Sequence, residues 1–323
     1  MTIYLEKFSP QPIIHMNRRA FLSKALMLAA GSATVPGMHL FAGNGKEKLP
    51  ADEYNQLNPL RRNTGTFTGR GGTIGWLADN HGIIVIDSQF PPSARTFFTE
   101  LQQHNSQSLL ALINTHHHAD HTAGNLYFSN IAEQIVAHEN VPELQRTIAE
   151  EQNSVDEQVY PDTTFDTEWR LDTGDEIIHA NYYGHAHTAG DIIIRFEKAN
   201  VVHMGDLVFN RWYPFIDTDG GADISNWIEV LQSVADDADR DTFFIFGHGS
   251  SEFGITGSTN DLIVMRDYLS ALLDFVDQRI SDGNSLEEIA SVGGLNGFPD
   301  HISPGARLSF QANVAAAWDE LHQ

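Results

Sequence analysis

A dense group of potential metal ligands follows an apolar run in the first half of the chain. The segment Thr115-His116-His117-His118-Ala119-Asp120-His121 carries five imidazole or carboxylate side chains. Imidazole and carboxylate together suit zinc and similar divalent ions. The segment directly follows the predicted strand Leu109–Asn114, and loops at strand ends are where rigid folds place functional residues. We therefore expect a metal site here rather than a solvated histidine-rich turn.

Three more distant stretches each add one candidate ligand next to a predicted strand. His187 lies in Tyr183–Asp191, between two such strands, Asp206 follows Val201–Met204, and His248 follows Thr242–Phe246. The chain contains no cysteine, which excludes disulfides, thiolate zinc sites, iron–sulfur clusters and a cysteine nucleophile. Any metal chemistry must therefore use nitrogen and oxygen ligands.

The elements that would position these residues alternate between sheet and helix. Short apolar runs predict strands at Thr73–Ala78, Gly82–Asp87, Leu109–Asn114, Gln134–Ala137, Glu176–Tyr183, Asp191–Phe196, Val201–Met204 and Thr242–Phe246. Helical patterns cover Ser93–His104, Asn140–Glu150, Ile224–Asp236, Asn260–Ile280 and Ala306–Leu321, with a short helix opened by a capping box of Ser285 and Glu288. So many strands make sheet the core of a single α/β domain with a helical C-terminal tail.

The N-terminal segment has the pattern of an export signal. Arg18 and Arg19 precede the apolar run Ala25–Ala33, which is shorter than the roughly 20 residues that a membrane span needs. Paired arginines in this position resemble a twin-arginine signal. We therefore expect residues 1–42 to be an N-terminal extension and signal peptide that engages the twin-arginine translocase. Residues 43–323 would then be the exported, periplasmic domain of a bacterial protein, with 258–323 as its tail.

The charge of the chain limits its partners. The sequence has 19 Lys and Arg against 43 Asp and Glu, a formal net charge of −24. Such a surface repels phosphate backbones, so we expect no nucleic-acid partner. After Gly254 the chain contains only three arginines and no lysine, so this part of the chain offers few cations to an anionic substrate. A neutral or weakly charged small molecule is the favoured substrate.

The order of the candidate ligands resembles the metallo-β-lactamase superfamily. The motif His-x-His-x-Asp-His, followed by His187, Asp206 and His248, fits that family over roughly Gly65–Gly249. The resemblance implies a four-layer αββα sandwich. It further implies that His116, His118 and His187 hold one Zn²⁺, that Asp120, His121 and His248 hold a second, and that Asp206 bridges both. An aspartate at position 206 differs from the antibiotic-degrading branches and is similar to glyoxalase II and the quorum-signal lactonases, which puts β-lactam hydrolysis in doubt as the native activity.

The resemblance also implies a reaction. Two zinc ions would activate a bridging hydroxide that attacks an acyl carbonyl of an ester, lactone, lactam or thioester, with Asp120 orienting the hydroxide. Arg211, Trp212, Tyr213 and Phe215 lie on a loop expected to overhang the metals. Tyr213 is a candidate donor to the oxyanion, or else an aromatic wall, and Trp212 and Phe215 suit a partly apolar substrate. Asp87 stands where the family places a carboxylate that orients a ligand histidine.

Two other functions fit the same fold. One is a sulfur dioxygenase that uses a single iron. The other is a periplasmic zinc-binding protein without catalysis. Measuring the metal content together with turnover of a substrate panel distinguishes these two functions from that of a hydrolase.

Overall fold

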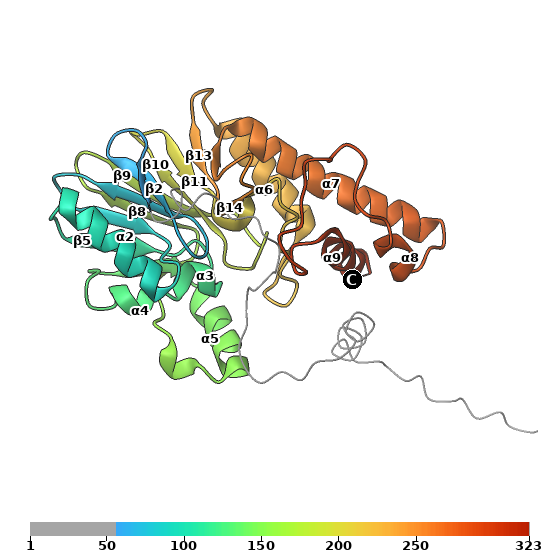
Figure 1. The fold of residues 1–323 in the computed structure, drawn as a ribbon, viewed down its shortest axis with the longest axis horizontal. Helices are drawn as coiled ribbons and strands as arrows, with labels where there is room; N and C mark the ends of the chain where they lie inside the picture. Colours follow the sequence, from blue (N-terminus) through green and yellow to red (C-terminus); the bar gives the residue numbers. More distant parts are fainter. Residues whose placement is uncertain (1–55, 323) are drawn as a thin grey trace, which may run out of the picture. The chain divides into compact units, whose positions relative to one another are not determined.

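Two β-sheets form the centre of the structure, a computed structural model that describes residues 56–322 (Figure 1). The first sheet has the strand order β1 (Gln56–Pro59), β2 (Thr64–Thr68), β3 (Ile74–Ala78), β4 (Ile83–Ile86), β5 (Leu109–Ile113), β6 (Ile135–His138) and β7 (Thr163–Phe165). The second has the order β15 (Thr256–Gly257), β13 (Phe243–Ile245), β11 (Val201–His203), β10 (Ile192–Phe196), β9 (Ile177–Tyr182) and β8 (Glu168–Asp172). A short parallel pair joins β12 (Phe209–Asn210) to β14 (His248–Gly249).

Helices cover the outer face of each sheet, as the grouping of buried side chains shows. One core cluster lies between the sheets and joins Ile86 and Ile113 of the first to Ile194 and Ile245 of the second. Another joins the first sheet to α2 (Pro91–His104) and α4 (Asn125–Phe128). The largest joins the second sheet to α6 (Ile224–Asp237), α7 (Thr259–Ser281), α8 (Leu286–Ala290) and α9 (Phe310–Leu321). The order is helix, sheet, sheet, helix, so the predicted αββα sandwich with C-terminal helices is confirmed.

The burial of the central strands explains why they could be predicted from the sequence. Strands β4, β5 and β6 pair in parallel, and nearly all their side chains are buried. Parallel strands covered on both faces are apolar throughout, which produces the continuous runs seen in the sequence. Sequence analysis did not predict β1, β2, β7 and β8 or the two-residue strands β12, β14 and β15. Strands β1, β7, β8 and β15 form the sheet edges, and β8 alternates between exposed and half-buried side chains. Strand β2 is almost wholly buried, but its Thr and Gly residues give no apolar run. Edge strands carry a weaker apolar signal because one side faces solvent.

The helices follow the predicted ranges within a few residues, with one later start. Helix α9 begins at Phe310 rather than at Ala306, because the Ser309 side chain caps it by accepting a hydrogen bond from the Ala312 amide. The predicted capping box of Ser285 and Glu288 is present at α8. The described chain also contains the short helix α3 (Ala119–Thr122), the helix α5 (Val141–Gln152), which was predicted at Asn140–Glu150, and a 3₁₀ turn, Val155–Glu157.

Two features of the chain concern its N-terminus and membranes. All described residues belong to one unit, Gly45–Gln323. The signal segment predicted for residues 1–42 lies outside the residues that the structure describes. Within residues 56–322, no helix has the length and apolar character needed to cross a bilayer.

Candidate metal centre

The seven candidate ligands come from four places in the chain, each at or just beyond a strand end. The segment His116–His121 follows β5 and includes α3. His187 lies in the connection from β9 to β10, and Asp206 lies in a 3₁₀ turn, Gly205–Leu207, directly after β11. His248 opens β14. Strands β11 and β13 run parallel, so Asp206 and His248 leave the second sheet at the same edge.

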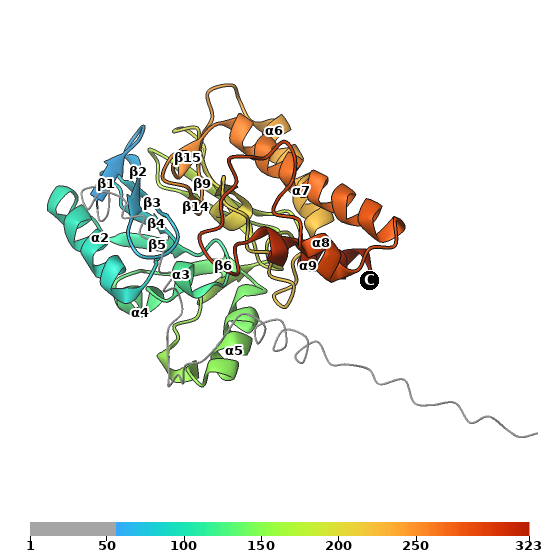
Figure 2. The same ribbon diagram turned by 45° about the vertical axis from the view of Figure 1, so that its right-hand side comes forward.

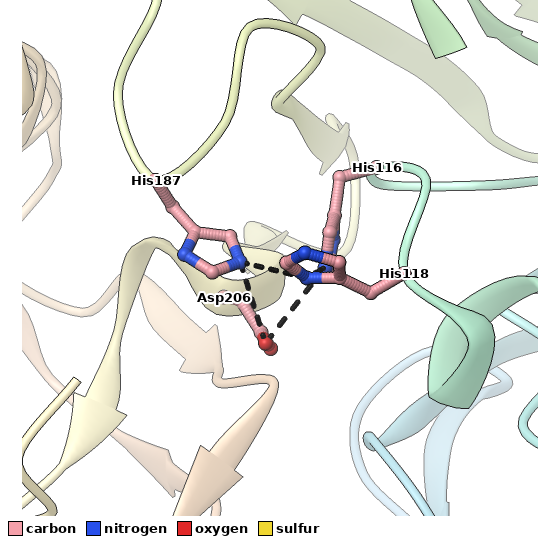
Figure 3. A group of neighbouring side chains, drawn as sticks. All are labelled: His116, His118, His187 and Asp206. Atoms are coloured by element: carbon pink, nitrogen blue, oxygen red, sulfur yellow. Dashed lines mark hydrogen bonds and ion pairs between the residues drawn. The ribbon is translucent and has the colours of Figure 1, made fainter. Parts of the chain in front are cut away.

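The first group of donors consists of three histidines and one aspartate (Figure 3). The His118 Nδ1 atom lies 2.9 Å from His116 Nε2 and 3.1 Å from His187 Nε2. Asp206 Oδ2 lies 3.8 Å from each of the same two Nε2 atoms. Donors placed tetrahedrally at about 2.1 Å from a zinc ion stand about 3.4 Å apart, so these spacings match one divalent ion.

The second group consists of Asp120, His121 and His248. The Asp120 Oδ2 atom lies 3.2 Å from His248 Nε2 and 3.8 Å from His121 Nε2. Asp206 also reaches this group, because its Oδ1 lies 3.1 Å from His121 Nε2 and its Oδ2 lies 3.3 Å from His248 Nε2. The carboxylate of Asp206 is therefore the side chain common to both groups.

Hydrogen bonds outside the first group decide which ring nitrogens face inward. His187 Nδ1 lies 2.7 Å from the carbonyl oxygen of Phe215 and donates to it, and His118 Nε2 donates to Asp217 Oδ2 at 2.8 Å. The single hydroxyl proton of Thr115 goes to Asp87, so Thr115 Oγ1 accepts from His116 Nδ1. Each ring thus carries its proton on the outer nitrogen, and three lone pairs converge on one point.

The donor atoms of both groups have the chemistry that a bound metal ion requires. Three lone pairs facing one another at 2.9 to 3.1 Å repel unless a cation lies between them. In the second group, Asp206 Oδ1 and His121 Nε2 are buried and have no hydrogen-bond partner. His121 donates its Nδ1 proton to Asp87 at 2.7 Å, so its Nε2 is the nitrogen that faces the carboxylates of the second group and becomes a metal donor once its proton leaves. Convergent acceptors with protons held outside are what metal-binding histidines require.

The pKa values follow the same division. Burial, aided by the charge of His121, holds the pKa of His116 well below its usual value, and burial with the charge of His118 lowers the pKa of His187 to about 3. Burial also lowers the pKa of His121 and His248, but Asp206 and its neighbouring carboxylates outweigh burial, raising the pKa of His121 and bringing that of His248 to about 9. Without a metal, protons occupy the second group.

Asp87 holds the histidine segment in place. It is fully buried, with a backbone φ of 62° in the left-handed region, and it accepts hydrogen bonds from the Thr115 amide, the Thr115 hydroxyl and His121 Nδ1. A buried aspartate kept in a strained backbone conformation with every oxygen used indicates a positioning role. The orienting carboxylate that sequence analysis suggested for Asp87 is thus present in contact with His121.

Two glycines allow the Asp206 turn, which follows β11, to pack closely against the chain that follows β13. A Cβ atom added at Gly247 would lie 1.9 Å from Asp206 Oδ1, so no other residue fits there without moving the ligand. Gly205 has φ +51°, which turns the chain directly before Asp206.

Sequence analysis missed Asp217. This buried residue accepts from His118 Nε2 and also lies 3.4 Å from His117 Nε2, so it fixes the ring that supplies Nδ1 to the first group. The signal in the sequence was weak, because Asp217 belongs to the polar stretch Asp217-Thr218-Asp219 in a loop without a known motif. His117, which is not a donor to either group, contacts Asp217 instead.

Replacing Asp217 with Ala is expected to weaken metal binding by about 10- to 100-fold, because the His118 ring loses the partner that orients it. Metal affinity is measured by competition with a chromophoric chelator. Asp219→Ala is the matched control, since Asp219 is exposed and lies two residues away. Equal affinities in the two variants would show that Asp217 does not position His118.

The aromatic residues after Asp206 divide between the two sides of their loop. Trp212 stacks on His248 with ring centres 5.7 Å apart, and Phe215 lies 5.3 Å from His118. Tyr213 packs instead against Tyr268, His301 and Phe310, and a Cβ at Gly294 would lie 2.9 Å from its hydroxyl oxygen. Among the described residues, no hydrogen bond joins that hydroxyl to any of the seven donors. The oxyanion-binding role of Tyr213 therefore stays a prediction.

Comparison with known proteins agrees with this geometry. The sequence profile of the family described as "Metallo-beta-lactamase superfamily" matches residues 67–248. This range covers more than half of the chain and all seven donors. The chain belongs to the metallo-beta-lactamase superfamily. As a member of this superfamily with His/Asp groups placed to bind metal, it uses a metal cofactor.

Individual proteins that this chain resembles are distant from it in sequence. A metallo-beta-lactamase type 2 from Elizabethkingia meningoseptica is 22% identical over 69% of this chain and 86% of its own length. The 2,4-dinitroanisole O-demethylase subunit alpha from Nocardioides sp. (strain JS1661) is 30% identical over 56% of each chain. The stereoselective inverting sec-alkylsulfatase Pisa1 from Pseudomonas sp. superposes with a TM-score of 0.67 at 16% identity, over 85% of this chain and 53% of that one. This chain thus spans about half the length of the alkylsulfatase and of the demethylase subunit.

Proposed function

We propose that this protein is a hydrolase that holds two zinc ions and cleaves an acyl bond in an ester, lactone, lactam or thioester. The observation that carries the proposal is the sharing of Asp206 between two groups of donors whose lone pairs converge. When bound, the two ions supply Lewis acidity and a water-derived nucleophile near neutral pH. A protein that only stored zinc would not need a carboxylate common to two adjacent sites.

The residues of the chain would divide the remaining work. His116, His118 and His187 hold one ion, and Asp120, His121 and His248 hold the other. Burial tends to raise the pKa of Asp120, but His121 and His248 lower it to about 2, so Asp120 is an unprotonated carboxylate at neutral pH. Its side chain is 17% exposed, against 4% for Asp206, which lets it accept a proton at the open side of the site and pass it to the leaving group.

The surroundings of the donors favour a partly apolar substrate. Trp212 and Phe209 stack on His248, and Phe215 lies against His118 and His187. These rings leave the metal groups bordered by apolar surface on the side of the loop after β12. The net charge of −24 opposes polyanionic substrates, which agrees with a neutral or weakly charged molecule.

The experiment that tests the proposal measures metal content and turnover in one preparation. The protein is loaded with zinc and assayed with a chromogenic ester, a lactone, a thioester, a cephalosporin and a secondary alkyl sulfate. About two zinc ions per chain with acyl turnover is the expected result. One iron with oxygen consumption would replace the proposal with a dioxygenase, sulfate turnover alone with a sulfatase, and metal without turnover with a binding protein.

A further inference from the structure

The segment of the C-terminal tail that connects α8 to α9 runs back toward the metal centre (Figure 2). Ile302 and Trp212 form a parallel bridge, in which the Ile302 amide donates to the Arg211 carbonyl at 3.0 Å and the Tyr213 amide donates to the Ile302 carbonyl at 3.1 Å. Trp212 is the residue whose ring stacks on His248. The tail is therefore attached by backbone hydrogen bonds to the loop that borders the second group of donors.

The same part of the tail brings a positive charge next to the first group. The guanidinium carbon of Arg307 lies 5.1 Å from the ring centre of Phe215. Phe215 in turn lies 5.3 Å from the His118 ring, and its carbonyl accepts the Nδ1 proton of His187. One aromatic ring thus separates the Arg307 guanidinium from two of the candidate metal ligands.

Arg307 differs from Arg211 and Arg266 in having no acidic partner within residues 56–322. Arg211 pairs with Asp261 at 3.2 Å, and Arg266 pairs with Asp267. Within residues 56–322, no ion pair or hydrogen bond engages the Arg307 guanidinium, and the residue is exposed. The Phe215 ring covers one side of the guanidinium, whose N–H groups have no partner within residues 56–322 and can bind a planar or tetrahedral oxyanion.

We propose that Arg307 is a specificity-determining residue that binds a singly charged oxyanion, a carboxylate or a sulfate-type group, on the substrate part remote from the scissile bond. The inference rests on the proposed function and narrows its substrate class. Phe215 lies beside Arg307, and Trp212 is paired with the half-exposed Ile302 on the same loop. These side chains would contact the apolar part of the same molecule. A single cation suits one negative charge, whereas the acidic surface repels molecules that carry several.

The test compares two esters that differ only in charge, mono-4-nitrophenyl glutarate and its methyl ester. Wild-type protein is expected to prefer the anionic ester. In R307Q the ratio of kcat/KM for the anionic ester to that for the methyl ester should fall by about 10- to 100-fold, mainly through a higher KM for the anionic ester. R307K should lose less. R279Q is the matched control, because Arg279 is also exposed and stacks on a phenylalanine, Phe275, at 5.3 Å.

Two results would overturn the inference, and each is distinct from failure of the proposed function. The first is an equal ratio in wild type, R307Q and R279Q. The second is a binding result, measured if wild-type protein cleaves neither of these two esters, so that the test stays separate from that of the acyl hydrolase. Calorimetry with hexanoate, hexanesulfonate and hexanamide then decides: R307Q should bind the acids about 10-fold more weakly than wild type and the amide equally, and equal affinity for the acids would overturn the role of Arg307. The two acids also show which oxyanion is preferred.

Discussion

Replacing Asp120 with Asn is expected to lower kcat/KM by about 100- to 10,000-fold while the protein keeps its fold. Asn has nearly the same shape but neither the charge nor the basicity of the carboxylate. Asp120 lies 3.2 Å from His248 and is the most exposed acidic donor of the centre, so the substitution affects both metal retention and proton transfer. His116→Ala should lose at least as much, because it removes one of three converging lone pairs.

The measurement is steady-state kinetics on the best substrate of the panel, with metal content and circular dichroism determined on the same samples. His185→Ala is the matched control. His185 is exposed and lies two residues before His187, and its side chain is not a donor to either metal group. Full activity in purified D120N or H116A would rule out the assignment of the site.

Removing the metal is expected to abolish turnover and to lower the thermal stability markedly. Metal that binds only the folded state stabilises it by about 4 kcal/mol at a free concentration of 1,000 times Kd, which corresponds to a Tm change of about 10 °C for a domain of this size. The physical cause is the group of acceptors that face one another without a cation. Chelation followed by readdition of zinc, monitored by activity and by thermal melting, checks both effects.

Metal binding should also weaken as the pH decreases. The carboxylates around His248 raise its pKa to about 9, so at pH 7 the metal must displace its proton. Affinity is therefore expected to fall by about tenfold per pH unit for each displaced proton as pH decreases from 8 to 6. Titrations in weak buffer should show proton release on zinc addition. Binding that is independent of pH, or a melting temperature unmoved by chelation, contradicts this account of the centre.

Local sequence accounts for the elements that carry the site. The apolar runs of β4, β5 and β6 are continuous because parallel central strands are covered on both faces, and this burial depends on each strand's own residues. The spacing in His116-x-His118-x-Asp120-His121 places its members within a few residues of one another whatever the rest of the chain does. Absence of cysteine restricts the ligands to nitrogen and oxygen. These features are readable without tertiary information.

Composition and order along the chain also suggested the remote donors His187, Asp206 and His248, but through resemblance to a family rather than through local physics. No local pattern brings positions more than 60 residues apart within 4 Å. That convergence depends on how the two sheets pack and on where β9, β11 and β13 end. The pairing of β11 with β13 carries Asp206 and His248 to one edge, and Gly247 permits their close approach.

Tertiary structure alone decided the partners that orient the site. Asp217 binds His118 from 99 positions away, and Arg307 reaches Phe215 because the tail pairs with the loop at Trp212. Sequence patterns report periodic burial and short-range spacing, because these act through neighbouring residues. A hydrogen bond between two loops produces no periodic pattern in the sequence. The sequence by itself therefore determined the types of the metal donors and the local helices and strands. The packing of the folded chain determined which residues surround those donors.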